Sequence, residues 1–137
     1  MIKYLFILLL SFNASAANYL TVTVASKHID DDDLNEFNPG LGVNIDQYIV
    51  GFFRNSHENN SVYLGYEFER RVKYFSLALQ LGMITGYTDS QLDSPSTGQW
   101  HLFALPEVII PLNDYRMKLG FIPMGDRTLT LQFEKRF

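Results

Sequence analysis

The sequence contains no cysteine, so no disulfide bond can stabilise the fold. It also lacks a continuous apolar segment of about 20 residues, the length that a membrane-spanning helix needs. Basic residues are in the minority, with 11 Lys and Arg against 15 Asp and Glu, and the formal net charge is −4. These absences argue against a disulfide-bonded scaffold, a helical membrane protein and a protein that binds nucleic acid.

The first 16 residues predict a secretory signal peptide. Lys3 precedes a short apolar run from Tyr4 to Leu10, and the small-x-small tripeptide Ala14-Ser15-Ala16 follows it. This order is typical of an exported precursor that is cleaved after the tripeptide. The mature chain is then residues 17–137, which is long enough for one domain.

Aromatic residues are abundant, with 8 Tyr, 11 Phe and 1 Trp, and this composition favours β structure. In most of eight segments, apolar side chains alternate with polar or small ones, which is the period of a β-strand. The segments are 20–24, 41–45, 48–52, 62–69, 75–83, 102–110, 115–121 and 129–137. They predict an all-β fold, an eight-stranded antiparallel transmembrane β-barrel.

The last segment is an amphipathic strand that ends the chain at Phe137. Outer-membrane barrels end in this way, because the final strand closes the barrel and the assembly machinery reads its terminal Phe. We therefore expect the apolar rows to face lipid and a polar set to fill the interior. That set is Glu67, Glu69, Gln80, Arg116, Lys118, Gln132 and Glu134. The reverse arrangement, a soluble lipocalin-like barrel, also agrees with the alternation, but the signal peptide and the terminal Phe favour the membrane barrel.

The connections between the predicted strands alternate in length. Those near 46–47, 71–73 and 112–114 are short, whereas Ser26–Pro39, Asn55–Asn60 and Tyr87–Gln99 are long. The last link, Pro123–Asp126, is short but contains Pro and Gly. Outer-membrane barrels have short periplasmic turns and longer extracellular loops. This alternation predicts that both termini lie in the periplasm and that His28, Asn55 and Ser56 lie at the extracellular rim. The acidic run Asp30–Asp33 is either a solvated loop or a place for divalent cations.

Five blocks of sequence occur in an order that resembles one family, the outer-membrane lipid A palmitoyltransferases. The blocks are Asn35-Glu36 leading to Gly40-Leu41-Gly42; Phe53-Arg54-Asn55-Ser56; Gly65-Tyr66-Glu67-Phe68-Glu69; Ala104-Leu105-Pro106 with Ile110-Pro111-Leu112; and Ile122-Pro123. The likeness covers residues 27–137. It implies an outer-membrane monomer, without cofactor or metal, that moves an acyl chain from phospholipid to the lipid A of lipopolysaccharide.

The resemblance also implies roles for individual residues at the rim. The family uses a His, an Asp and a Ser, which correspond here to His28, Asn55 and Ser56. His28 would act as general base, Ser56 would activate or position the acyl ester, and Asn55 would orient the imidazole. Because Asn55 stands where the family has Asp, a second reading stays open: a non-catalytic outer-membrane barrel that binds lipopolysaccharide or another surface ligand through its loops.

Further family features fall inside the barrel and at its sides. Counted from Ser56, Glu67 stands where the family has a glycine on the floor of the acyl pocket, so Gly65 and Glu67 are expected at that pocket. Four residues are expected to be available as cationic partners of Glu67. They are Arg71, Arg116, Lys118 and Arg136. Pro106 and Pro123 match family prolines near lateral openings for lipid, where proline cannot donate to a ladder.

Overall fold

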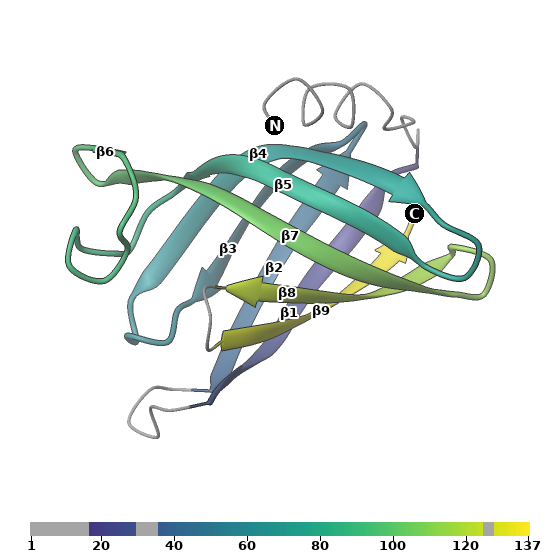
Figure 1. Cartoon of the computed structure of the whole chain (residues 1–137), viewed down its shortest axis with the longest axis horizontal. Helices are drawn as coiled ribbons and strands as arrows, with labels where there is room; N and C mark the ends of the chain where they lie inside the picture. The colour runs from purple at the N-terminus through teal and green to yellow at the C-terminus, as the bar shows by residue number, and fades with distance from the viewer. Residues whose placement is uncertain (1–16, 30–35, 125–127) are drawn as a thin grey trace, which may run out of the picture.

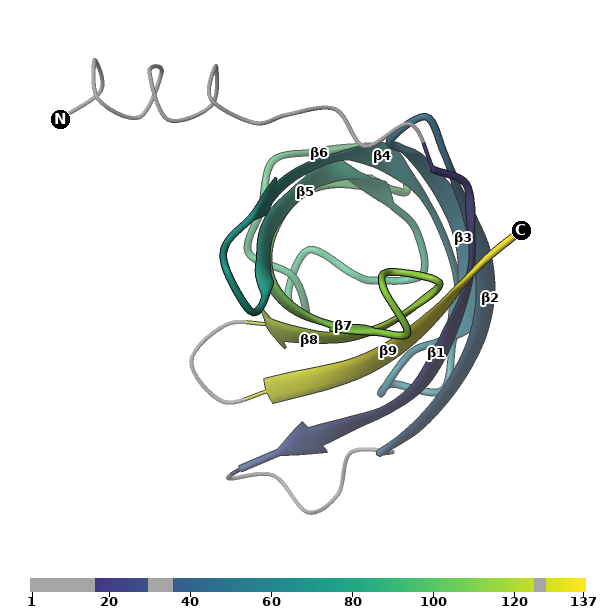
Figure 2. The same ribbon diagram turned by 90° about the vertical axis from the view of Figure 1, so that its right-hand side faces the viewer.

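A computed structural model of the chain describes residues 17–29, 36–124 and 128–137. These residues form a closed eight-stranded antiparallel barrel without a helix (Figure 1). The strands are β1 (Tyr19–His28), β2 (Phe37–Ile45), β3 (Tyr48–Arg54), β4 (Asn60–Arg71), β5 (Ser76–Ile84), β7 (Trp100–Leu112), β8 (Met117–Met124) and β9 (Thr128–Arg136). Neighbours in sequence pair throughout, β1 pairs with β9, and β5 pairs with β7, which closes the ring seen end-on in Figure 2. The two-residue β6 (Ser96–Thr97) pairs with the start of β7.

The eight predicted segments correspond one to one with the eight barrel strands, so the predicted β-barrel is confirmed. Most of the observed strands extend beyond the segments in which apolar and polar side chains alternate. β1 reaches His28 and β2 begins at Phe37, so the first connection is 29–36 and not 26–39. β6 was not predicted, because two residues carry no periodic pattern. The predicted signal peptide and the acidic run Asp30–Asp33 lie outside the described residues.

The two ends of the barrel differ in the length of their connections. At the turn end, β2 and β3 are joined by Asp46 and Gln47, whose positive φ angles of 50° and 75° suit a two-residue hairpin. The connections 72–75 and 113–116 lie at the same end. At the loop end, 55–59 join β3 to β4, and 85–99 join β5 to β7 (Figure 1). These two described connections are longer than those at the turn end, as predicted.

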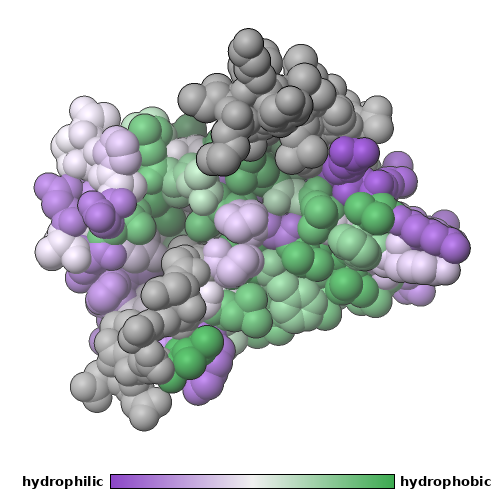
Figure 3. Space-filling model, viewed as in Figure 1, coloured by the Kyte–Doolittle hydropathy of each residue, from purple (hydrophilic) through white to green (hydrophobic). Residues whose placement is uncertain are grey.

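Apolar side chains cover the outside of the barrel. The exposed set includes Leu20, Leu41, Val50, Phe52, Val62, Leu64, Leu77, Leu102, Ile110 and Leu129. Figure 3 shows hydrophobic side chains over much of the middle of one face and hydrophilic ones toward both ends. The buried polar set includes Thr21, Asn44, Glu67, Glu69, Gln80, Glu107, Lys118, Gln132 and Glu134. This distribution agrees with the apolar-out prediction and does not fit the lipocalin-like alternative.

Lys118 lies at the centre of an ionic cluster in the turn-end half of the interior. Its Nζ is 2.6 Å from Oε2 of Glu69 and 3.6 Å from Oε2 of Glu134. The same ammonium lies 4.0 Å from the centroid of the Tyr19 ring. Lys118 and Glu134 are each only 1% exposed. The cation therefore neutralises carboxylates that would otherwise be buried at a high cost in free energy.

One expectation about this interior was wrong, and another holds only in part. Arg116 was expected in the polar core but is exposed, because it belongs to the turn at 113–116 and β8 begins only at the next residue. Lys118, a possible partner of Glu67, attracts it electrostatically, but its direct ion pairs are with Glu69 and Glu134. Glu67 instead accepts hydrogen bonds from Asn44 Nδ2 at 3.0 Å and Gln80 Nε2 at 3.1 Å. The remaining candidates, Arg71 and Arg136, are exposed at the turn end, where Arg71 stacks on Tyr115.

The Lys118 cluster generates a prediction about stability. Lys118→Met keeps the length of the side chain but leaves two carboxylates buried without their cation. We expect the free energy of unfolding to fall by about 3–5 kcal/mol, measured by urea unfolding of the barrel in detergent micelles. The control Lys135→Met changes an exposed lysine and should stay within about 0.5 kcal/mol of the unmodified protein. Equal stability of the two variants would contradict the assigned role of Lys118.

Candidate functional site at the loop end of the barrel

A β-bulge in β1 decides which side chains of this strand enter the barrel. The register of β1 with both neighbours shifts between Thr23 and Ala25. Before the shift Thr21 and Thr23 are buried, and after it Ser26 and His28 are buried. Because a bulge inserts one residue, it reverses the alternation that follows. Without it, His28 would share the outward face of Leu20 and would point away from the interior.

His28 is in hydrogen-bond contact with three hydroxyl groups. Its Nε2 is 2.8 Å from Ser56 Oγ and 3.3 Å from Ser26 Oγ, and its Nδ1 is 3.0 Å from Thr128 Oγ1. Thr128 lies directly opposite His28 in the β1–β9 register. If Nδ1 carries the proton and donates it to Thr128, Nε2 is left as an acceptor for Ser56. The structure thus brings together His28 and Ser56, two of the three residues predicted for the rim.

Ser26 and Asn38 extend this hydroxyl cluster. Ser26 Oγ donates to Asn38 Oδ1 at 2.5 Å and lies 3.4 Å from Ser56 Oγ. Asn38 Nδ2 donates to the carbonyl oxygen of Arg54 at 3.1 Å and reaches Ser56 Oγ at 3.5 Å. Sequence reasoning missed Ser26, Asn38 and Thr128, since only the bulge and the strand register bring them to the imidazole.

Asn55 has different hydrogen-bond partners from the one predicted for it. It is 0% exposed, and its Nδ2 donates to Ser61 Oγ at 3.0 Å and to the carbonyl oxygen of Gly86 at 2.8 Å. Its Oδ1 accepts from the backbone N–H groups of His57 at 2.9 Å and Asn59 at 3.1 Å. These four bonds use the full capacity of the amide. Asn55 therefore holds the loop that carries Ser56, and the contact with the imidazole that was expected of it is made by Thr128.

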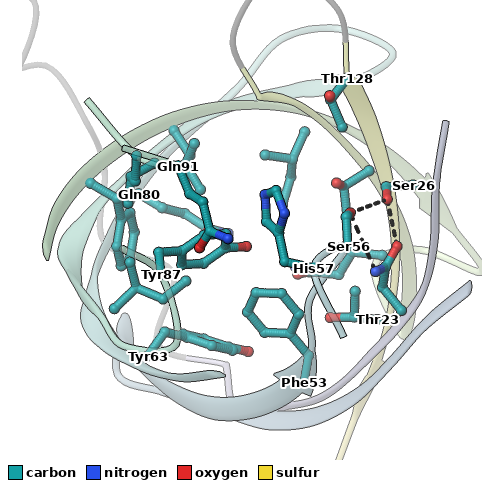
Figure 4. A pocket seen from close by; sticks show the side chains of 18 of the residues that line it. Thr23, Ser26, Phe53, Ser56, His57, Tyr63, Gln80, Tyr87, Gln91 and Thr128 are labelled. Carbon is teal, nitrogen blue, oxygen red and sulfur yellow. Dashed lines mark hydrogen bonds between the residues drawn. The ribbon is translucent and has the colours of Figure 1, made fainter. Parts of the chain in front are cut away.

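A cavity of about 380 Å³ lies beside the hydroxyl cluster, within the range of small-ligand sites. Its lining residues are Thr23, Ser26, His28, Asn38, Phe53, Ser56, His57, Tyr63, Gln80, Ile84, Tyr87, Gln91, Leu92, Phe103, Leu105, Ile122, Thr128, Thr130 and Gln132. Figure 4 shows Ser26, Ser56 and Thr128 on one side, and Gln80, Tyr63 and Tyr87 on the other. His57, the residue after Ser56, projects between them. The cavity thus combines apolar walls with a polar cluster at the rim.

Tyr87 closes part of the cavity from the 85–99 connection. Its ring meets that of His57 edge-on at a centroid distance of 6.1 Å, and its carbonyl oxygen lies 3.1 Å from Nε2 of the buried His101. Burial raises the pKa of the Tyr87 phenol to about 12. At neutral pH the phenol is therefore a neutral hydrogen-bond donor at the wall of the cavity.

Gly65 and Glu67, expected at the acyl pocket, are not among the residues that line this cavity. Glu67 is 1% exposed and lies behind Gln80, to which it is hydrogen-bonded. Gly65 packs against the backbone of β5, and a Cβ there would overlap the carbonyl oxygen of Leu81. The count from Ser56 followed a single strand, whereas the depth of the cavity depends on side chains from neighbouring strands, so both residues lie outside its lining.

Pro106 and Pro123 lie where β7 and β8 separate. The β7–β8 ladder runs from Leu112 opposite Met117 to Val108 opposite Phe121 and ends there. Beyond that point Pro106 is still paired with Leu79 of β5, and Pro123 with Leu129 of β9. Proline has no N–H to donate, which suits the end of a ladder. The two prolines predicted at lateral openings therefore flank a recorded break in the β7–β8 pairing.

The bonds of Asn55 generate a second prediction. Asn55→Asp replaces two N–H donors by an oxygen, so Ser61 and the Gly86 carbonyl lose their partner within the interior. We expect the free energy of unfolding to fall by about 1–3 kcal/mol, measured by urea unfolding in micelles. Asn59→Asp, an exposed change in the same loop, is the matched control and should have little effect. The role assigned to Asn55 is wrong if both variants are as stable as the unmodified protein.

Within 17–29, 36–124 and 128–137, no three His, Cys, Asp or Glu side chains are grouped to hold a metal ion. The same residues contain no helix that is long and apolar enough to cross a membrane. Comparisons of the chain with protein-family models, with curated proteins and with solved structures gave no match.

Proposed function

We propose that this barrel transfers an acyl chain from a phospholipid to the lipid A of lipopolysaccharide in the outer membrane. The observation that carries the proposal is the contact of His28 Nε2 with Ser56 Oγ, at 2.8 Å, on the wall of an apolar cavity of about 380 Å³. An acyl chain would occupy the cavity, and its ester would lie beside the imidazole. The break in the β7–β8 ladder at Pro106 and Pro123 supports a lateral path for the lipid.

His28 would act as the general base of this reaction. Nε2 takes the proton of the acceptor hydroxyl, whose oxygen attacks the acyl carbonyl carbon, and the ester bond to the phospholipid breaks. The departing alkoxide then takes the proton back from the imidazolium, so the proton balance closes. Thr128 orients the ring through Nδ1. When the acceptor hydroxyl takes its place at Nε2, Ser56 turns its one hydroxyl hydrogen from the imidazole to the acyl carbonyl oxygen. These assignments replace the role that was expected of Asn55.

A second candidate function is binding without chemistry. It is favoured by the partners of the imidazole, which are the neutral hydroxyls of Ser26, Ser56 and Thr128. Hydroxyls can fix the tautomer of His28, but they stabilise an imidazolium less than a carboxylate does. Such a cluster suits recognition of the polar part of lipopolysaccharide, or of another surface ligand, with the apolar part of the ligand in the cavity.

Both candidates include insertion into the outer membrane of a Gram-negative cell, after export through the signal peptide. The apolar exterior and the closed ring support it, because strands that contact lipid need apolar side chains and neighbours on both sides over most of their length. In this orientation the loop end faces outward and both termini lie in the periplasm. The partners are then phospholipid, lipopolysaccharide and the barrel assembly machinery, and closure of the ring is consistent with a monomer.

The catalytic proposal predicts a change in lipid A. Cells that produce the protein should contain lipid A heavier by one acyl chain, as measured by mass spectrometry. His28→Ala should reduce this product about 100-fold or more, and Thr128→Val should reduce it less because it removes only the orienting bond. Ser90→Ala, an exposed change in the 85–99 connection, is the control. If lipid A is unmodified in cells that produce the protein, the acyltransferase proposal is wrong and the binding function is favoured. If His28→Ala keeps full activity, the mechanism is wrong.

Insertion generates a further prediction at the C-terminus. Phe137 is 69% exposed at the turn end, and its substitution by Ala should lower the amount of barrel assembled in the outer membrane. The assembled form is measured by its faster migration on an unheated detergent gel. Phe37→Ala, which changes a Phe that is 63% exposed at the loop end, should assemble normally. Equal assembly of the two variants would argue against recognition of the terminal Phe.

A further inference from the structure

The deep end of the cavity is formed by polar side chains. Gln80 is the deepest cavity-lining residue on β5, and Gln132 is the deepest on β9. Each is 6% exposed, so what remains accessible is the small area that borders the cavity. Four residue steps separate Thr128 at the rim from Gln132 at the floor, which is about 13 Å along an extended strand. The two glutamines therefore face the end of a ligand that enters far past His28.

Hydrogen bonds behind the floor consume every N–H donor of the two amides. Gln80 Nε2 donates to Glu67 Oε2 at 3.1 Å and to Glu107 Oε2 at 2.8 Å. Gln132 Nε2 donates to Glu134 Oε1 at 3.0 Å and, more weakly, to Glu107 Oε1 at 3.5 Å. A primary amide has two N–H hydrogens. Both nitrogens are therefore taken up by the polar core, and the carbonyl oxygens are the groups of these two cavity-lining amides that remain for a ligand.

The carboxylates that fix this orientation are themselves held in place. Glu67 accepts a hydrogen bond from Asn44, and Glu134 lies 3.6 Å from the ammonium of Lys118. The carboxyl group of Glu107 fits against Gly120, in space that a larger side chain there would occupy. Rotating either amide would break the hydrogen bonds that its nitrogen makes to these side chains. The floor consequently offers hydrogen-bond acceptors to a ligand and keeps its donors behind.

We propose that the cavity binds an amphiphile whose apolar body contacts the walls and whose buried end carries a hydrogen-bond donor, such as a hydroxyl group. The wall includes Phe53, Phe103 and Leu105, which suit an alkyl body. An unsubstituted alkyl end would cover the oxygens of Gln80 and Gln132 without replacing their water, which disfavours binding. If the barrel is an acyltransferase, this ligand is the transferred acyl group, and that identification alone rests on the function proposed above.

The test compares two ligands that differ only at the buried end. They are the methyl ester of a straight-chain fatty acid and the methyl ester of the same acid with a terminal hydroxyl, used over a series of chain lengths. Each is titrated into the ¹⁵N-labelled full-length mature barrel in micelles, and the side-chain amide signals of Gln80 and Gln132 are followed by NMR. We expect the hydroxylated ester of the best length to bind about tenfold tighter, the gain of one net hydrogen bond. No acceptor lipid is present, so the result does not depend on turnover.

A glutamine variant assigns the preference to the floor. Gln132→Met keeps the length of the side chain but removes its carbonyl oxygen, and it should abolish most of the preference for the hydroxylated ester. Gln99→Met, at an exposed glutamine outside the cavity, should leave the preference unchanged and corrects for partition of the esters into micelles. If Gln132→Met does not fold, the comparison of the two esters on the unmodified barrel is sufficient to test the proposal. Equal or weaker binding of the hydroxylated ester, or a preference that survives in folded Gln132→Met, would overturn the proposal.

Discussion

Closure of eight strands into a ring sends alternate side chains into a narrow interior, and every polar group there needs a partner. The pairing of Lys118 with Glu69 and Glu134 meets this need at the turn end. The amides of Asn44, Gln80 and Gln132 then connect the neighbouring carboxylates into one network. The network fills the turn-end half of the barrel, so the cavity is confined to the loop end. The position and the polarity of the cavity floor thus depend on how the buried charges are satisfied.

The bulge in β1 has a comparable effect on the rim. One inserted residue reverses the alternation and places Ser26 and His28 beside Thr128, Thr130 and the loop that carries Ser56. Asn55 fixes that loop through four hydrogen bonds. The imidazole is therefore held from two sides, by β9 and by the β3–β4 connection. A rim of this kind is preorganised, which is a requirement shared by a catalytic base and by a recognition site.

The two candidate functions differ in what they ask of the imidazole. A base must carry a positive charge during the reaction, whereas a binding site only needs to hold one tautomer in place. The hydroxyl partners of His28 satisfy the second demand fully and the first in part. The apolar cavity and the break between β7 and β8 at Pro106 and Pro123 serve both functions, because each handles a lipid that must enter from the side or from the rim.

Much of the fold could be predicted from the sequence, because strand alternation is a local property with a period of two. It determined the eight barrel strands and the common end of His28 and Ser56, whereas the apolar exterior was predicted from the signal peptide and the terminal Phe, because alternation alone allows both arrangements. Pairing between strands decided the rest. His28 points inward because of a register shift in β1, and it contacts Thr128 because β1 pairs with β9. The partners of Lys118 and Glu67 are set by which side chains of neighbouring strands lie at the same depth in the barrel. Asn55 was misassigned for the same reason, since its partners Ser61 and Gly86 come from other strands and loops. Register and depth are relations between distant segments, and a periodic pattern within one strand carries no information about them.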